Sequence, residues 1–196
     1  HTGQDQYILA KRKERIEAAK AEIEQIIDFK QDVKISLSFT NLECDASSAL
    51  LGFAGPVGSV YKDFAGAPQS NVWYTPAQAA DFGLSTAQSQ TAHIGAEFSN
   101  KIGTAPCQNF SWYFGTDHNP GPGQIDFLST AVHEFMHGLG FLSFISTDGA
   151  PFLGVMDNYS TFLFNNATSK SWKVMTNGER ATSILSNNNL IWNGAK

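Results

Sequence analysis

Residues 132–143 have the sequence VHEFMHGLGFLS, and the interpretation of the whole chain depends on this stretch. On an α-helix, residues four apart lie one above the other on the same face, so His133 and His137 can direct their imidazoles at one cation. Glu134 lies one step around the helix, within reach of a water on that cation. Two neutral imidazoles and an adjacent carboxylate suit a catalytic zinc ion when a third ligand comes from elsewhere in the chain.

The motif falls at the end of the only strongly helical apolar run in the middle of the chain, residues 125–137. Apolar residues recur there at helical spacing and predict one buried face, made of Ile125, Leu128, Val132 and Phe135. Gly138 and Gly140 follow, and glycine commonly ends a helix because it accepts a left-handed backbone conformation. The sequence therefore predicts a helix that carries both histidines near its end.

A length of 196 residues predicts one domain with a sizeable hydrophobic core. Hydrophobic residues make up 42% and charged residues 16%, which is typical of a folded chain with a sparsely charged surface. Residues 1–34 carry equal numbers of basic and acidic side chains, so the net charge of −5 belongs to the remainder. No basic patch lies outside this first stretch, which disfavours nucleic-acid binding. No apolar run approaches the ~18 residues of a membrane span.

The two cysteines, Cys44 and Cys107, are far apart in the sequence and form no C-x-x-C motif. A single long-range pair favours one disulfide bond in an exported protein, and the alternative is two free buried thiols in a cytosolic one. We expect the disulfide, and with it a secreted, extracellular protein. The chain begins at His1 without methionine, so we also expect a processed or trimmed form.

The remaining hydrophobic pattern predicts an α+β chain. Apolar residues at three- and four-residue spacing indicate a long first helix, expected to pack against the domain because the charges on its other faces are mixed in sign. Alternating and aromatic runs indicate short strands. The expected elements are helices at 4–29, 75–82, 125–137 and 178–187, and strands at 33–39, 72–74, 93–98, 112–114 and 190–192.

The pattern His133-Glu134-x-x-His137-x-x-Gly140 resembles the first eight positions of the zinc-binding signature of the metzincins, a group of zincin metallopeptidases. In that family the glycine allows a sharp turn after the helix, so that a third ligand can return to the metal. The eleventh position, His or Asp in metzincins, is Ser143 here. A serine hydroxyl is a poor zinc ligand, so the third ligand must lie elsewhere.

A longer resemblance, over roughly residues 33–194, is to secreted bacterial zinc peptidases that carry a protease-associated domain. The matching segments are 112–117, 123–144, 156–160, 172–177 and 190–194. This resemblance implies a zincin-like catalytic domain with a twisted mixed β-sheet, a central zinc-binding helix and a long N-terminal helix. We expect a single domain over 1–196, consisting of the N-terminal helix at 1–30, the sheet and active-site helix at 31–140, and a C-terminal part at 141–196 that supplies the third ligand.

Asp157 is our choice for the third zinc ligand, because carboxylate is an accepted zinc donor and the family-like D-x-Y segment begins there. It follows the motif by twenty residues, which leaves room for the chain to return to the metal. The alternatives are His118, Asp148 and Glu179. A lone histidine on the polar face of a strand is ordinarily solvated, so we expect no ligand role for His93.

The resemblance also implies roles around the metal. Glu134 is expected to act as the general base that takes a proton from the attacking water and passes it to the leaving amine. Metzincins place a methionine in a turn beneath the metal, for which Met175 is the candidate and Met156 the second choice, with ordinary core packing as the alternative. Tyr159 either assists the oxyanion or lines the cleft. The strand at 93–98 is expected at the cleft edge, where its main chain would pair with an extended substrate.

Together these expectations describe a secreted zinc-dependent endopeptidase with one catalytic Zn²⁺ ion, a protein or peptide substrate and a monomeric state. A catalytically weak zinc-binding or pseudo-protease module used for protein binding is the second hypothesis, which the absent metzincin ligand favours. The third is a structural chain with an accidental H-E-x-x-H. The loop at 115–123 is a candidate for Ca²⁺ by composition, although it lacks the full ligand spacing.

Overall fold

The structure is a computed structural model that describes residues 3–194, with side chains from residue 6 onward. Its elements, in chain order, are α1 (Gly3–Glu24), β1 (Ile35–Thr40), β2 (Gly52–Pro56), α2 (Pro76–Asp81), α3 (Ser85–Gln88), β3 (Ile94–Ser99), β4 (Ser111–Tyr113), β5 (Gln124–Asp126), α4 (Phe127–Leu139), β6 (Leu163–Asn165), β7 (Lys170–Ser171), α5 (Asn177–Ile184) and β8 (Leu190–Trp192). Three 3₁₀ turns lie between α4 and α5: η1 (Phe152–Gly154), η2 (Ser160–Phe162) and η3 (Trp172–Val174). Helices and small mixed sheets together make an α+β fold, as the hydrophobic pattern predicts.

The largest sheet has the strand order β1-β3-β2. β1 runs parallel to β3, with Ile35 opposite Ile94, whereas β2 runs antiparallel to β3, with Pro56 opposite Ile94. Because β3 is paired on both sides, it has no free edge for a substrate. The prediction that the strand at 93–98 forms the cleft edge is therefore wrong, and β2 is an edge strand instead.

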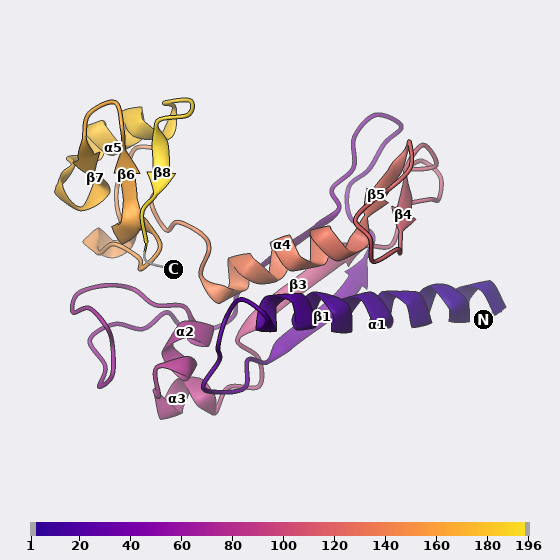
Figure 1. Cartoon of the computed structure of the whole chain (residues 1–196), viewed down its shortest axis with the longest axis horizontal. Helices are drawn as coiled ribbons and strands as arrows, with labels where there is room; N and C mark the ends of the chain where they lie inside the picture. Colours follow the sequence, from indigo (N-terminus) through magenta and orange to yellow (C-terminus); the bar gives the residue numbers. More distant parts are fainter. Residues whose placement is uncertain (1–2, 195–196) are drawn as a thin grey trace.

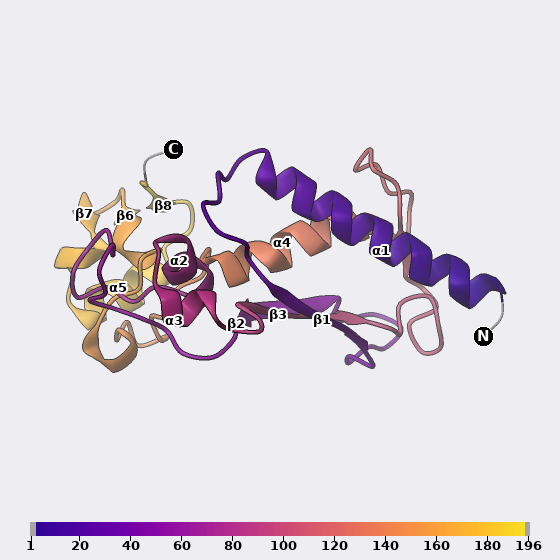
Figure 2. The same cartoon turned by 90° about the horizontal axis from the view of Figure 1, so that it is seen from below.

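Helix α4 lies between α1 and the sheet (Figure 2). Its underside meets the sheet through aromatic rings: the centroid of Phe98 lies 5.2 Å from that of Phe127 and 6.3 Å from that of Phe135. On the opposite side, Ala19 and Ile23 of α1 are buried in the same core cluster. Each buried ring of this kind contributes about 1.5–3 kcal/mol, so the helix that carries the motif is fixed from both sides.

Helix α1 ends at Glu24, five residues before the predicted end at residue 29. Within the stretch from 25 to 29 expected to be helical, Ile26 is 72% exposed, whereas Ile27 packs against the core. A few residues further on, the amides of Lys30 and Gln31 donate to the carboxylate of Asp81, which ties this connection to α2. The expected packing of the first helix against the domain is confirmed.

The C-terminal residues form a second unit beyond the end of α4 (Figure 1). Its antiparallel sheet has the order β7-β6-β8, and its core contains Leu163, Trp172 and Met175. The buried guanidinium of Arg180 donates to the carbonyls of Gly149, Trp172 and Met175 and so ties α5 to the preceding loops.

Two features join distant parts of the chain. The predicted strand at 72–74 is reduced to isolated bridges, in which Trp73 pairs with Asp157 and Tyr74 with Tyr61. The sulfur atoms of Cys44 and Cys107 lie at bonding distance with their Cα atoms 5.8 Å apart, within the range of a disulfide.

Among the described residues, no helix is long and apolar enough to cross a membrane.

Candidate metal centre

Both ends of α4 are fixed by its sequence. At the start, the carboxylate of Asp126 accepts a hydrogen bond from the amide of Leu128 at 3.0 Å, which caps the helix and complements its dipole. At the end, Gly140 adopts φ 110°, a left-handed conformation that suits glycine. The buried face includes Phe127, Leu128, Ala131, Phe135 and Leu139. The predicted helix is thus confirmed, shifted by two residues toward the C-terminus.

A close approach of helix and sheet sets the level of the motif. A Cβ atom added at Gly138 would collide with the side chain of Ile94 on β3, so only glycine lets α4 lie this near to the sheet. Ile94 is also the partner of Pro56 at the end of β2. The segment that carries His137 therefore lies level with the Pro56 end of the edge strand.

The two motif histidines point at the same place. Nε2 of His133 lies 3.0 Å from Nε2 of His137, and the ring centroids are 4.5 Å apart. Zinc–nitrogen bonds of about 2.0–2.1 Å at a tetrahedral angle place two ligand nitrogens about 3.3 Å apart. The two nitrogens need only a small further separation to serve as two of the ligands of a zinc ion.

A hydrogen bond fixes the tautomer of one of these rings. Nδ1 of His137 lies 2.9 Å from the carbonyl oxygen of Phe141. A carbonyl only accepts, so Nδ1 carries the proton and Nε2 keeps its lone pair. In zinc proteins, the ring nitrogen that does not bind the metal commonly donates a hydrogen bond of this kind, which orients the histidine ligand.

Glu134 is buried, with 8% of its surface exposed, although it belongs to the most polar part of the helix. Among the side chains of residues 6–194 and the amides of residues 3–194, none donates a hydrogen bond to its carboxylate. Glu134 follows His133 directly in the sequence, so a largely buried carboxylate belongs to the same helical turns as the two convergent imidazoles.

Asp157 is buried, with 3% of its surface exposed, and its carboxylate holds two backbone segments together. One oxygen accepts from the amide of Phe144 and the other from that of Ser160, both at 2.8 Å. Each carboxylate oxygen has two lone pairs, so these bonds leave acceptor capacity for a metal. Within residues 3–194, however, no three His, Cys, Asp or Glu side chains come together in a group that could hold a metal ion. The structure pairs two of the predicted ligands and leaves Asp157 apart from them.

The alternative third ligands all have local partners. The carboxylate of Asp148 accepts from the hydroxyl of Ser146 and from the amide of Ala150 within one turn. Glu179 forms an ion pair with Lys170 and closes the capping box of α5 with Thr176; the bond from Lys170 and those from Thr176 lower its pKa to about 2. His118 uses both ring nitrogens in the network described below.

Tyr159 and Met175 both lie in the C-terminal unit. Met175 is buried with Leu163 and Trp172, and Tyr159 packs against this cluster. Core packing of Met175 is observed, and its place beneath a metal stays a prediction. Burial raises the pKa of Tyr159, and the charge of Asp157 adds to this effect, so its hydroxyl stays protonated and can donate a hydrogen bond.

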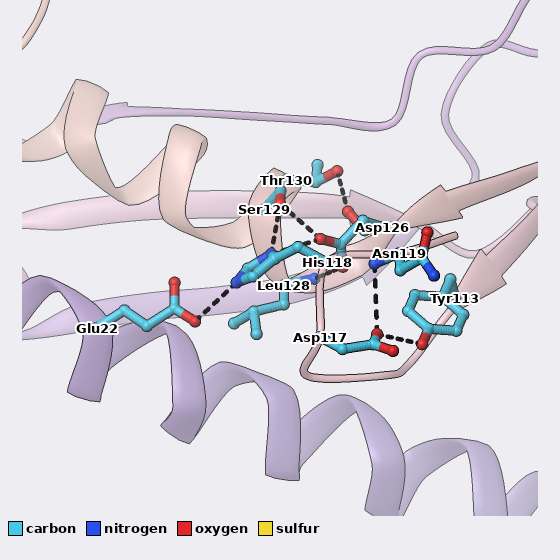
Figure 3. A network of polar contacts seen from close by, with 9 residues as sticks. All are labelled: Glu22, Tyr113, Asp117, His118, Asn119, Asp126, Leu128, Ser129 and Thr130. Atoms are coloured by element: carbon cyan, nitrogen blue, oxygen red, sulfur yellow. Dashed lines mark hydrogen bonds and ion pairs between the residues drawn. The ribbon is translucent and has the colours of Figure 1, made fainter. Parts of the chain in front are cut away.

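A second group of titratable side chains joins α1 to the start of α4 (Figure 3). Nδ1 of His118 lies 2.8 Å from a carboxylate oxygen of Asp126 and 2.9 Å from the hydroxyl of Ser129, and its Nε2 lies 3.1 Å from the carboxylate of Glu22. Serine and aspartate meet the same nitrogen, so this is not the arrangement of a Ser-His-Asp triad. Its effect is to connect Glu22 of α1 with the N-cap of α4.

The charges in this network shift two pKa values in opposite directions. The hydrogen bond with Asp126 raises the pKa of His118, burial opposes this, and Glu22 adds to the increase. Burial would raise the pKa of Asp126, but hydrogen bonds from Ser129, His118 and the Leu128 amide outweigh it and lower that pKa. His118 is therefore charged over a wider pH range than a free histidine.

This raised pKa predicts a pH-dependent stability. The interactions of protonated His118 add to the free energy of unfolding. This contribution is complete below the ordinary histidine pKa of about 6.5 and is lost as the pH rises through the higher pKa in the folded state. We expect the wild-type chain to lose thermal stability relative to His118→Gln as the pH rises upward from about 6.5. Thermal unfolding of both proteins across this range measures the effect. A difference in Tm between them that is independent of pH would contradict it.

Sequence patterns missed the environment of His93. The alternating pattern predicts a solvated ring, but His93 is fully buried: its Nδ1 accepts from the amide of Lys34 at 3.1 Å, and its Nε2 lies 3.0 Å from the carbonyl of Ala87. The prediction of a solvated histidine is wrong, because the backbone before β1 and that of α3 close over the start of β3. Its lack of a ligand role agrees with these contacts, since both nitrogens are occupied.

The fold and the site together define an α+β chain whose packed helix presents a histidine pair and a buried glutamate. A scan of protein-family models, a search of curated proteins and a search of solved structures each find no match to this chain. The case for its function therefore depends on the geometry of the site.

Proposed function

We propose that this chain is the catalytic domain of a secreted zinc-dependent endopeptidase of the zincin type, with a metzincin-like motif. The observation that carries the proposal is the convergence of the Nε2 atoms of His133 and His137, 3.0 Å apart, with the tautomer of His137 set by the Phe141 carbonyl. The buried Glu134 beside them supports hydrolysis over a purely structural metal site, which has no need of a free carboxylate.

The edge strand β2 supports a peptide as the substrate. The amide of Val57 donates to the carbonyl of His93, and the amide of Ser99 donates to the carbonyl of Leu51. Between these two bonds, successive residues of β2 direct their backbone N–H and C=O groups alternately toward β3 and away from it. Gly52, Ala54 and Pro56 then direct their backbone groups away from β3. Main-chain pairing with these groups would hold a substrate in an extended form along the sheet edge, level with the histidine pair.

The chemistry follows from the side chains at this position. A zinc ion held by His133 and His137 supplies a Lewis acid that polarises the substrate carbonyl and lowers the pKa of water. Glu134 takes the proton from the attacking water and delivers it to the nitrogen of the leaving amine. Tyr159, protonated because its pKa is raised, is the proposed hydrogen-bond donor to the developing oxyanion.

One observation favours the second hypothesis, a zinc-binding module without efficient catalysis. Asp157 does not join the histidines in a three-ligand group within residues 3–194. Two protein ligands alone would hold zinc weakly, since catalytic sites ordinarily have three. The endopeptidase proposal therefore requires Asp157, or another carboxylate, to reach the metal when it is bound.

Zinc loading separates these possibilities. We expect the purified chain to bind one zinc ion and to cleave casein, to lose cleavage when treated with a chelator, and to regain it when zinc is restored. Metal content measured by mass spectrometry and digestion followed by electrophoresis are the two readouts. Bound zinc without cleavage would favour the binding module, and a chain that retains no zinc would contradict both hypotheses. A His133→Ala, His137→Ala double variant is the control for zinc bound elsewhere.

A further inference from the structure

Four aromatic rings gather just beyond the end of α4. The ring of Phe141 lies 6.0 Å from Trp192 and 6.2 Å from Tyr159, measured between centroids. Tyr159 and Trp192 are stacked, with centroids 6.2 Å apart and planes inclined by 16°, and Phe162 lies 5.5 Å from Trp192. The chain leaves α4 and runs directly into the unit that contains β8 (Figure 1), so three separate segments build this aromatic cluster.

The cluster is only partly covered. Phe141 is 41% exposed and Trp192 is 39% exposed, although the chain buries several other aromatic rings completely. A fully buried aromatic side chain removes about 150–250 Å² of its own surface from water. At their observed exposures, the rings of Phe141 and Trp192 together leave on the order of 150–200 Å² of apolar surface accessible to solvent. Exposed apolar surface that is concentrated in one place marks a binding site more often than scattered residues do.

The cluster is continuous with the histidine pair. The carbonyl of Phe141 accepts from Nδ1 of His137 at 2.9 Å, and its amide donates to the carbonyl of Met136 at 3.0 Å. These two contacts fix the backbone of Phe141 relative to the imidazole of His137. Tyr159, whose ring lies 6.2 Å from that of Phe141, follows the proposed ligand Asp157 by two residues. An extended peptide advances about 3.3–3.6 Å per residue, so a substrate held at the histidines would place a neighbouring side chain within reach of these rings.

The size and chemistry of the cluster select its occupant. A stable protein interface needs about 800 Å² from each partner, several times what the exposed rings offer. The four rings carry no charge, and their faces favour another ring or a large aliphatic group. One side chain of a peptide fits this area, whereas a second copy of the chain does not.

We propose that Phe141, Tyr159 and Trp192 form a specificity subsite that receives an aromatic or large aliphatic side chain next to the scissile peptide bond. This inference rests on the proposed peptidase function and names the class of substrate for that same site. Phe162 packs against the indole of Trp192.

The first test is independent of hydrolysis. N-acetyl-phenylalaninamide, added to the zinc-free chain, should shift the indole N–H signal of Trp192 in NMR spectra, while N-acetyl-alaninamide should not. Loss of that signal in Trp192→Phe identifies it among the four tryptophans. Equal shifts of all the indole signals, or none, would overturn the subsite.

The second test uses the zinc-loaded chain and peptides that differ only in the residues flanking one bond. We expect kcat/KM to be at least about tenfold higher with phenylalanine beside that bond than with alanine, and Trp192→Ala to remove most of this preference. Tyr7→Ala, which removes an exposed ring on α1, should leave the ratio unchanged. A preference that survives in Trp192→Ala would overturn the proposal. Indole shifts without any cleavage would instead contradict the peptidase function and leave the apolar site in place.

Discussion

Replacing Glu134 with glutamine is expected to lower kcat/KM for a peptide substrate by roughly 10²- to 10⁴-fold, the usual contribution of a positioned general base. The substitution keeps the shape of the side chain and removes its ability to accept a proton. Glu134 is largely buried and is the only carboxylate within the H-E-x-x-H motif, whose histidines converge at their Nε2 atoms.

Zinc content is the readout that gives this result its meaning. Glu134 is not one of the proposed ligands, so Glu134→Gln should bind as much zinc as the wild-type chain. Glu17→Gln, on the exposed surface of α1, is the matched control and should retain full activity. Activity retained in Glu134→Gln would refute the general-base role, and lost zinc would show that the residue acts on the metal instead.

Local patterns predicted the elements whose side chains alternate between core and solvent. The helix at 125–137 was predictable because Leu128 and Phe135 recur at helical spacing, and it brings His133 and His137 together as the i, i+4 rule requires. The strand at 93–98 was predictable for the same kind of reason. Its position in the sheet was not, because strand order depends on contacts between residues far apart in sequence.

The edge strand β2 left almost no trace in the sequence. Its five residues, Gly52–Pro56, include two glycines and a proline, which strand propensities disfavour. Proline is tolerated there because an edge strand leaves alternate amides unpaired. The residues that weaken the sequence signal are therefore compatible with the free edge that a substrate strand would use.

The parts of the site assembled from distant segments were also beyond prediction. The two amides that Asp157 accepts from belong to Phe144 and Ser160, and nothing in the composition of these segments indicates such bonds. The aromatic cluster likewise combines Phe141 with Trp192, about fifty residues later. Each residue alone resembles an ordinary surface or core aromatic, and only their proximity makes them a candidate subsite.

The largest expected effect on metal binding comes from Asp157. If it is the third ligand, Asp157→Asn should weaken zinc binding by more than the ~10–100-fold that loss of an outer-shell partner costs. If its carboxylate only supports the backbone, zinc affinity should stay within that range. Competition with a chelator of known affinity measures the difference.

Stability must be measured separately, because Asp157 also holds the amides of Phe144 and Ser160. Asparagine keeps one acceptor oxygen, so we expect the zinc-free Asp157→Asn chain to lose about 1–3 kcal/mol of unfolding free energy for the other amide. Asp148→Asn is the matched control: it also weakens local hydrogen bonds in a turn, but should leave zinc affinity unchanged. Weaker zinc binding in Asp148→Asn alone would move the third ligand to that residue. A folded Asp157→Asn chain with undiminished zinc affinity would refute the ligand role, since its hydrogen bonds to the backbone would then account for its burial.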